Sequence, residues 1–258
     1  MRSGRRVAGA LLRFLAAVCL TTGCAAPTVV SLPRDTGSRD TVIRQILPSS
    51  VQLRCERGNG TRRAASGVVL GSDPISGQTW ILTTRHLLVP VEQQTVSVSV
   101  PGRKDWIPAT VKAMSAEMDL ALLEVTGLGL PAVRIKETVR LGDDVWVVAY
   151  PWGRRLTIVS GVVSQITASA GEHAMEGPAR MVNASVSYGA SGGGVFDGPT
   201  GALIGVVEGY RTARMTLPDA PDRVLELPVP GETNVIAGDA ILRFLTASGL
   251  ATEHLLMK

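Results

Sequence analysis

The sequence predicts an all-β protein made of two packed antiparallel β-barrels of six strands each, with a short helix before the first barrel and a helix after the second. Valine and glycine are abundant, while aromatic residues make up 4% of the 258 residues, which suits short strands and turns. From residue 51 onward, short β-rich runs alternate with turn signals. No helical pattern separates these runs, which favours antiparallel barrels over a parallel sheet.

The first 23 residues have the pattern of a secretory signal. Arg2, Arg5 and Arg6 precede an apolar stretch, and a small residue then precedes Cys24. This ending resembles the lipobox of bacterial lipoproteins, so we expect a signal peptide over residues 1–23 and a lipid anchor on Cys24. The protein would then be exported and held in the bacterial cell envelope, facing the periplasm or the cell exterior. An uncleaved membrane anchor and an ordinary cleaved signal are the alternatives.

The excess of basic over acidic residues lies in the same segment. Residues 1–23 hold four of the 26 basic residues and no acid, so the remaining chain, with 22 acidic residues, is formally neutral. A nucleic-acid partner would need a basic patch in the folded part, and we therefore expect none. Beyond Cys24 the only cysteine is Cys55, and no Cys/His metal spacing occurs. The sequence predicts no disulfide, no metal and no cofactor.

The first barrel is expected within residues 41–135. Residues 24–40 contain prolines and small polar residues and predict a flexible tether. A short helix over residues 41–47 is predicted to end at Pro48. The strands that follow are expected near residues 51–55, 66–71, 79–84, 94–99, 106–113 and 119–125.

The second barrel is expected within residues 136–258. Its strands are predicted near residues 144–149, 156–166, 180–185, 194–197, 202–208 and 232–237. Residues 239–248 have the apolar spacing of a closing amphipathic helix.

Ser191 stands in a run of four glycines that leads into an apolar strand. Glycine permits positive φ and close backbone approach, so this run predicts a tight turn that presents the hydroxyl as a nucleophile. The same turn can aim the N–H groups of Gly189 and Ser191 at one point, which is the layout of an oxyanion hole. A flexible turn with an incidental serine is the alternative.

A serine nucleophile needs a base and a group that orients the base. His86 closes an apolar, β-branched run, whereas His173 and His254 lie in a polar segment and near the C-terminus. Asp119 stands at the edge of another apolar run. Each residue alone is typical of an ordinary strand end; the combination with Ser191 points to a catalytic triad.

Three segments in this order resemble the trypsin-like serine proteases, and within them the bacterial HtrA (Deg) branch. They are ILTTRHLL (81–88), MDLALLEV (118–125) and GASGGGVF (189–196), supported by ILPSSVQL (46–53), SGVVLG (66–71), LGDDVWVVAYPWG (141–153) and TIVSGVVSQI (157–166). The resemblance covers about residues 41–212. It implies a cleft between the barrels, with His86 and Asp119 from the first and Ser191 from the second, and polypeptide substrates.

The resemblance also implies substrate contacts. Ser185 and Tyr188 would line the first subsite, where Ser185 replaces the acid that selects basic residues, so a small or medium apolar residue is expected. Ala190 has no charge to pair with a new N-terminus, so activation by such pairing is not expected. The residues after Ser191 are used to finish the second barrel, and a PDZ domain is not expected.

Glu208 departs from the family pattern, which places a hydroxyl residue near this position to bind the catalytic aspartate. A carboxylate close to Asp119 would repel it and raise one of the two pKa values. Either Glu208 turns outward, which we expect, or activity is reduced.

Three functions from different classes remain open. The first is a serine endopeptidase of the cell envelope. The second is a protease-fold protein that binds polypeptides without cleaving them because Glu208 spoils the triad. The third is a lipid-anchored scaffold whose cleft has no function. The sequence carries no signal for the oligomeric state.

Overall fold

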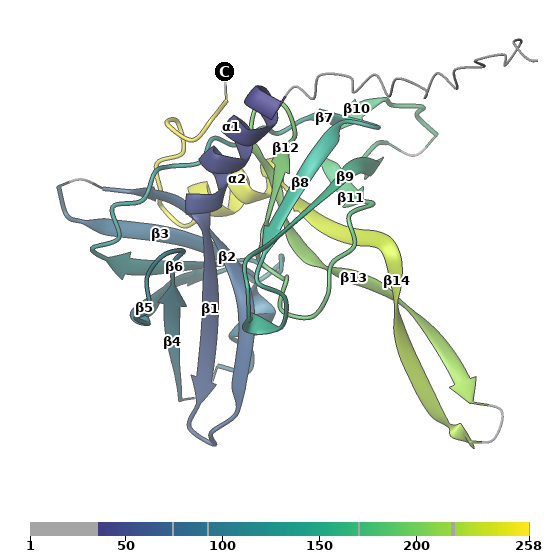
Figure 1. Cartoon of the computed structure of the whole chain (residues 1–258), viewed down its shortest axis with the longest axis horizontal. Helices are drawn as coiled ribbons and strands as arrows, with labels where there is room; N and C mark the ends of the chain where they lie inside the picture. The colour runs from purple at the N-terminus through teal and green to yellow at the C-terminus, as the bar shows by residue number, and fades with distance from the viewer. Residues whose placement is uncertain (1–35, 74, 92, 170, 218–219, 258) are drawn as a thin grey trace, which may run out of the picture. The chain divides into compact units, whose positions relative to one another are not determined.

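A computed structural model describes residues 36–257, apart from residues 74, 92, 170 and 218–219 (Figure 1). The predicted signal over residues 1–23, Cys24 and most of the predicted tether lie outside the described residues. No helix within the described ranges is long and apolar enough to cross a membrane.

Six antiparallel strands close the first barrel, and each lies near its predicted position. Their order around the barrel is β1-β2-β3-β6-β5-β4. The strands are β1 (Ser50–Arg57), β2 (Arg62–Ser72), β3 (Gln78–Thr83), β4 (Gln94–Ser99), β5 (Ile107–Met114) and β6 (Ala121–Thr126).

The second barrel also closes six antiparallel strands, in the order β11-β14-β13-β12-β8-β9. The strands are β8 (Asp144–Ala149), β9 (Thr157–Ile166), β11 (Ala179–Val182), β12 (Gly194–Asp197), β13 (Leu203–Leu217) and β14 (Ala220–Ala237). A small pair of strands that the sequence did not predict, β7 (Val139–Arg140) and β10 (Glu176–Gly177), stands beside this barrel. The two-barrel prediction is therefore confirmed.

The predicted lengths of β13 and β14 were wrong. These strands extend far beyond the expected 202–208 and 232–237 and form one long hairpin. Its outer side chains from Arg211 to Thr216 are all exposed. Pro228 and Pro230 lie in the outer part of β14, and proline within a run argues against a strand in sequence.

One helix lies at each end of the described chain. Helix α1 (Thr36–Ile46) is followed by a single 3₁₀ turn, η1 (Leu47–Ser49), and α2 (Gly238–Ala247) follows β14. Helix α1 begins inside the predicted tether. This part was missed because residues 36–41 have no apolar spacing in the sequence, and residues 39–41 are exposed. Val42 and Ile46 of α1 are nevertheless buried.

The core consists of three clusters of buried side chains. One fills each barrel, and a third joins the two barrels to each other and to both helices. Successive residues of a strand serve different clusters: Ile81 fills the first barrel while Leu82 belongs to the shared cluster. In the second barrel, Val147 and Val148 divide in the same way. This shared cluster fixes the barrels against each other, and the candidate site lies where they meet.

Candidate active site

Ser191 stands on a turn that only glycine can build. Gly189 and Gly192 have φ angles of 87° and 80°. A Cβ atom on Gly192 would lie 2.2 Å from the carbonyl oxygen of Ser66, so a side chain has no room there. Gly192 donates its N–H to Val207 O at 2.8 Å, which fastens the turn to β13. The turn leaves the Ser191 side chain partly exposed.

His86 and Asp119 are brought together by strand pairing. Thr83 at the end of β3 pairs with Ala121 at the start of β6, so the residues after β3 lie beside those before β6. His86 lies in the 3₁₀ turn η2 (Arg85–Leu87). Its main-chain N–H donates to Asp119 Oδ1 at 2.8 Å, and its ring Nδ1 lies 2.5 Å from Asp119 Oδ2.

This contact fixes the tautomer of the imidazole ring. An ionised carboxylate only accepts hydrogen bonds, so the ring proton must sit on Nδ1. The neutral ring then has Nε2 free as an acceptor. Partial burial raises the pKa of Asp119, but the hydrogen bonds and charge of His86, with the charge of Arg85, outweigh burial and hold that pKa below its ordinary value. Asp119 is therefore ionised at neutral pH.

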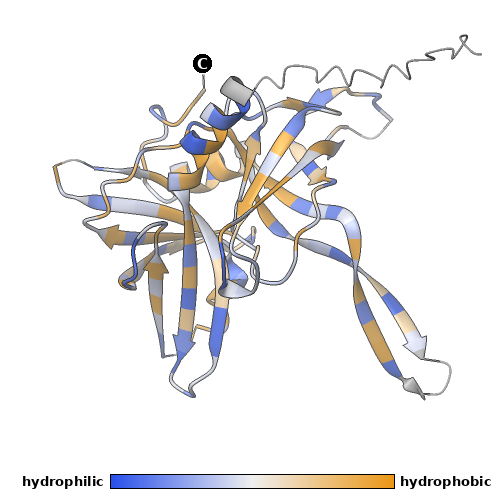
Figure 2. Ribbon diagram, viewed as in Figure 1, coloured by the Kyte–Doolittle hydropathy of each residue, from blue (hydrophilic) through white to orange (hydrophobic). Residues whose placement is uncertain are grey.

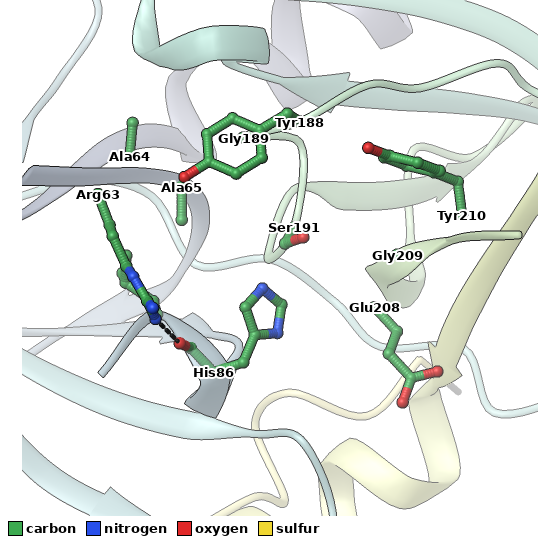
Figure 3. Close-up of a pocket in the computed structure, with 11 residues that line it drawn as sticks. Arg63, Ala64, Ala65, His86, Tyr188, Gly189, Ser191, Glu208, Gly209 and Tyr210 are labelled. Atoms are coloured by element: carbon green, nitrogen blue, oxygen red, sulfur yellow. Dashed lines mark hydrogen bonds between the residues drawn. The ribbon is translucent and has the colours of Figure 1, made fainter. Parts of the chain in front are cut away.

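His86 and Ser191 line one cleft at the junction of the barrels, with a volume of about 420 Å³. Figure 3 shows the imidazole of His86 next to the side chain of Ser191. The other lining residues are Arg63, Ala64, Ala65 and Leu87 from the first barrel and Tyr188, Gly189, Glu208, Gly209 and Tyr210 from the second. The predicted triad residues are thus gathered at this junction.

Two N–H groups of the turn are available to an oxygen in the cleft. Within the described residues, neither Gly189 nor Ser191 donates its N–H to another protein atom. The Tyr188 carbonyl accepts the Trp152 N–H at 2.7 Å. In a trans peptide, carbonyl and N–H point in opposite directions, so this bond turns the Gly189 N–H away from Trp152.

Ser66 is a supporting residue that sequence reasoning missed. It is 1% exposed and belongs to β2 of the first barrel. Its hydroxyl donates to the Gly189 carbonyl at 2.8 Å and accepts the Tyr150 N–H at 2.8 Å. Its own N–H donates to the Ser191 carbonyl at 2.9 Å. Ser66 therefore ties the turn of one barrel to the wall of the other.

Replacing Ser66 by alanine is expected to lower the free energy of unfolding by about 1–3 kcal/mol, because Gly189 O and Tyr150 N–H become buried without a partner. Urea unfolding measures this change. Ser160→Ala, at an exposed serine of β9, is the control and should change stability by less than about 0.5 kcal/mol. Equal stability of the two variants would contradict the role given to Ser66.

Trp152 is a second residue that the sequence did not single out. It has a φ of 58°, and no other non-glycine residue of the described chain has positive φ. Its exposed ring lies 5.4 Å from the ring of Tyr188, centroid to centroid. A positive φ is unfavourable for a tryptophan, and the hydrogen bond from its N–H to the Tyr188 carbonyl helps to hold this conformation.

The two residues predicted to bind substrate, Ser185 and Tyr188, differ in their position relative to the cleft. Tyr188 lines the cleft, whereas Ser185 does not; its hydroxyl accepts the N–H of Gly231 at 3.1 Å. Glu208 is exposed, and in Figure 3 its carboxylate points away from Ser191, which is the outward orientation expected from the sequence. Although the residue is exposed overall, desolvation of its carboxyl group, and then the charge of Asp119, raise the pKa of Glu208, while the charge of His86 lowers it.

The described residues contain no group of three or more His, Cys, Asp or Glu side chains able to hold a metal ion. The cleft itself offers a serine hydroxyl, an imidazole ring and main-chain N–H groups.

The chain is similar to known proteins in sequence and in fold. A family model for the "Trypsin-like peptidase domain" matches residues 65–206. The chain is 30% identical over 158 residues to the "Probable periplasmic serine endoprotease DegP-like" of Pseudomonas fluorescens, a match that covers 60% of this chain and 32% of that protein. It is 27% identical over 214 residues to "Serine protease PepD" of Mycobacterium tuberculosis, covering 76% of this chain and 44% of that protein.

Among solved structures, a serine endoprotease from Yersinia pestis superposes with a TM-score of 0.61 at 21% identity, covering 82% of this chain and 66% of that one. At this identity the similarity supports the fold alone. The chain spans between about a third and less than half of the length of the two curated relatives.

Proposed function

The chain belongs to the trypsin-like peptidase family, and from this premise we propose that it is a serine endopeptidase that hydrolyses polypeptides with His86, Asp119 and Ser191. The observation that supports the proposal most is the junction of the barrels, where the ring of His86 is bound to Asp119 and shares one cleft with Ser191.

His86 acts as the general base in this mechanism. With its proton held on Nδ1 by Asp119, the ring accepts the Ser191 proton at Nε2 while Oγ attacks the substrate carbonyl. The imidazolium ion that forms is stabilised by the Asp119 carboxylate. It then gives its proton to the leaving amine, which leaves the acyl group on Ser191. In the second half of the reaction, water attacks this acyl group while His86 accepts its proton, and that proton passes to Ser191 Oγ as the acid product leaves.

The N–H groups of Gly189 and Ser191 stabilise the negative oxygen that develops during this attack. Loss of one such donor typically costs about 3 kcal/mol of barrier. The bond from the Trp152 N–H to the Tyr188 carbonyl holds the peptide group of the Gly189 N–H, and the bond from the Gly193 N–H to the Ala190 carbonyl holds that of the Ser191 N–H, before substrate arrives.

We further propose that the protein works in the bacterial cell envelope. The relatives named as periplasmic endoproteases support this location. In this proposal, residues 1–23 are a lipoprotein signal, residues 24–40 a tether, and residues 41–135 and 136–258 the two barrel domains. Cys24 carries the lipid.

Cys24→Ala is expected to move the protein from the membrane fraction to the soluble fraction of the expressing cell. The reason is that a lipid chain contributes about 0.8 kcal/mol for each buried CH₂ group, and the variant has no site to receive it. Fractionation followed by immunoblotting measures the change. Cys55→Ala is the matched control, since that thiol is buried in the first barrel. Unchanged membrane binding of Cys24→Ala would exclude the anchor.

The proposed activity is tested on a second protein that has been unfolded by reduction and alkylation and serves as the substrate. The wild-type chain should generate new N-termini in this substrate, which mass spectrometry identifies, and His86→Ala should not. If well-folded wild-type protein captures this substrate without cleaving it, the polypeptide-binding function is favoured. If it neither cleaves nor captures it, the scaffold function is favoured.

A further inference from the structure

Arg63 is a charged residue of the cleft that the proposed mechanism does not use. It lies near the start of β2, next to Ala64 and Ala65 of the cleft wall. Figure 2 shows that this hydrophilic start of β2 gives way to the hydrophobic residues of the barrel. The Nη1 group of Arg63 donates to the main-chain carbonyls of His86 and Val89 at 3.1 Å and 3.0 Å. These bonds fix the guanidinium group beside the turn that carries His86, as Figure 3 shows.

Within the described chain, the positive charge of Arg63 has no counter-charge. Both of its hydrogen-bond acceptors are neutral carbonyl groups. No carboxylate of the described residues forms an ion pair with Arg63, whereas Arg62 next to it is paired with Glu56 at 3.0 Å. A guanidinium group has five N–H donors, and the bonds described use those of Nη1 alone. Nε and Nη2 are therefore free to bind one carboxylate through two parallel hydrogen bonds.

Two further arginines add positive charge beside this wall of the cleft. A Cβ atom on Gly153 would lie 2.4 Å from the Cβ atom of Ala64, so the 3₁₀ turn η3 (Pro151–Gly153) packs directly against β2. Arg154 and Arg155 follow this turn, and both are exposed and outside the ion pairs of the described chain. Like charges on one wall add to the potential in the cleft. This end of the cleft therefore attracts a negatively charged group.

The opposite end of the cleft is negative. Glu208 of β13 is the only carboxylate among the described residues that line the cleft, and it is exposed. Beyond Glu208, a second hollow of about 390 Å³ has more acidic than basic side chains, namely Glu117, Asp119, Glu208 and Asp239 against Arg180 and Arg243. In Figure 3, Arg63 and Glu208 lie on opposite sides of His86 and Ser191. The two ends of the cleft thus carry opposite charges.

We propose that Arg63 binds a carboxylate of the substrate on the leaving side of the cleaved bond and so selects acidic substrates there. His86 must give its proton to the leaving amine, so the leaving half of the substrate lies along the first-barrel wall that holds His86 and Arg63. The acyl half lies toward Glu208, which repels a carboxylate. The carboxylate belongs to an aspartate or glutamate side chain or to the C-terminus of the substrate. This inference rests on the proposed peptidase function.

Matched peptides test the proposal, with cleavage followed by chromatography. Their sequence is taken from a site that the wild type cleaves in the unfolded protein substrate. Each peptide ends in an amide and carries either Gln or Glu at the first, second or third residue on the leaving side. At the best of these positions, the wild type should cleave the Glu peptide with a kcat/KM about fivefold above that of its Gln partner. A fivefold change corresponds to about 1 kcal/mol, the upper end of the range for exposed ion pairs, because the arginine is already held in place.

Two further comparisons identify the source of the carboxylate and its side. If the C-terminus is the ligand, a Gln peptide that ends in a free carboxylate should gain over its amide; if a side chain is the ligand, the Glu peptides of the amide series should gain. A peptide with Glu on the acyl side should be cleaved more slowly than its Gln partner, because Glu208 repels it. All of these differences should shrink toward equal rates at about 0.5 M salt, which screens exposed charges.

Variants of Arg63 assign the preference to this residue. Arg63→Gln should remove it, and Arg63→Glu should reverse it. Arg63→Lys keeps the charge but loses the paired donors, so a smaller preference should remain. Arg62→Gln is the matched control and should keep the full preference, because Arg62 is paired with Glu56 and does not line the cleft. Each preference is a ratio of two peptides on one enzyme, so a general loss of activity through the bond to His86 cancels.

Product inhibition of the wild type decides the question if the Arg63 variants fail to fold. The leaving-side fragment with the carboxylate should inhibit about fivefold more strongly than the Gln fragment, and salt should remove the difference. Equal kcat/KM for carboxylate and Gln peptides, a preference that survives in Arg63→Gln, or faster cleavage with Glu on the acyl side would overturn the inference and leave the peptidase function standing. A wild type that cleaves no unfolded protein would instead reject the proposed function.

Discussion

Ser191→Ala is expected to lower kcat on a short ester or peptide by about six orders of magnitude, the effect typical of removing a nucleophilic serine. Alanine leaves the turn intact but removes the atom that attacks the carbonyl. Any remaining rate over water comes from the N–H groups of the cleft. Steady-state kinetics with an active-site titration of the wild type measures the loss.

Ser187→Ala is the matched control, because this serine belongs to the same loop and does not line the cleft. It should retain kcat within a few-fold of the wild type. A Ser191→Ala variant that hydrolyses the substrate at the wild-type rate would mean that another group performs the chemistry.

Asp119→Asn is expected to lower kcat by about 10⁴-fold, as loss of the third triad member does in enzymes of this mechanism. Asp119 accepts two hydrogen bonds, from the main-chain N–H and the ring Nδ1 of His86. An asparagine oxygen that keeps the first turns its NH₂ group toward Nδ1. The ring must then carry its proton on Nε2, where it cannot accept the proton of Ser191.

Asp105→Asn serves as the control for this variant, since Asp105 is an exposed carboxylate of the same barrel paired with Arg103. The pH dependence of stability gives a second readout. The lowered pKa of Asp119 contributes stability above the ordinary aspartate pKa and loses it as the pH falls through the lowered value. The wild type should therefore lose its stability advantage over Asp119→Asn in acid. Full activity of Asp119→Asn at neutral pH would contradict the tautomer argument.

The sequence predicted the parts of the fold in which burial repeats regularly. Every strand of the first barrel alternates or runs apolar, and each lies close to its predicted place. The serine turn could also be predicted, because the glycines that its positive φ angles require are present in the sequence. His86 was predicted at the end of one strand and Asp119 at the start of another, and these two strands pair in the structure.

The features that escaped prediction depend on contacts between distant segments. Nothing in the neighbourhood of Ser66 indicates that its hydroxyl bonds to Gly189, which is 123 residues further along the chain. The outer part of the β13–β14 hairpin is exposed, and Pro228 and Pro230 of β14 argue against a strand in sequence. The bond between the Ser185 hydroxyl and the Gly231 N–H of β14 likewise joins segments far apart in the sequence, and the prediction that Ser185 lines the first subsite stays a prediction.

The most direct test of the central claim is to map the adduct of a fluorophosphonate probe, which reacts with serines that a neighbouring base has activated. The proposed mechanism predicts one adduct per folded chain, on the peptide that contains Ser191. It also predicts no adduct in urea and a greatly slowed reaction in His86→Ala. A folded wild-type chain that stays unlabelled, or that carries the probe on another residue, would contradict the proposal that His86 and Asp119 activate Ser191.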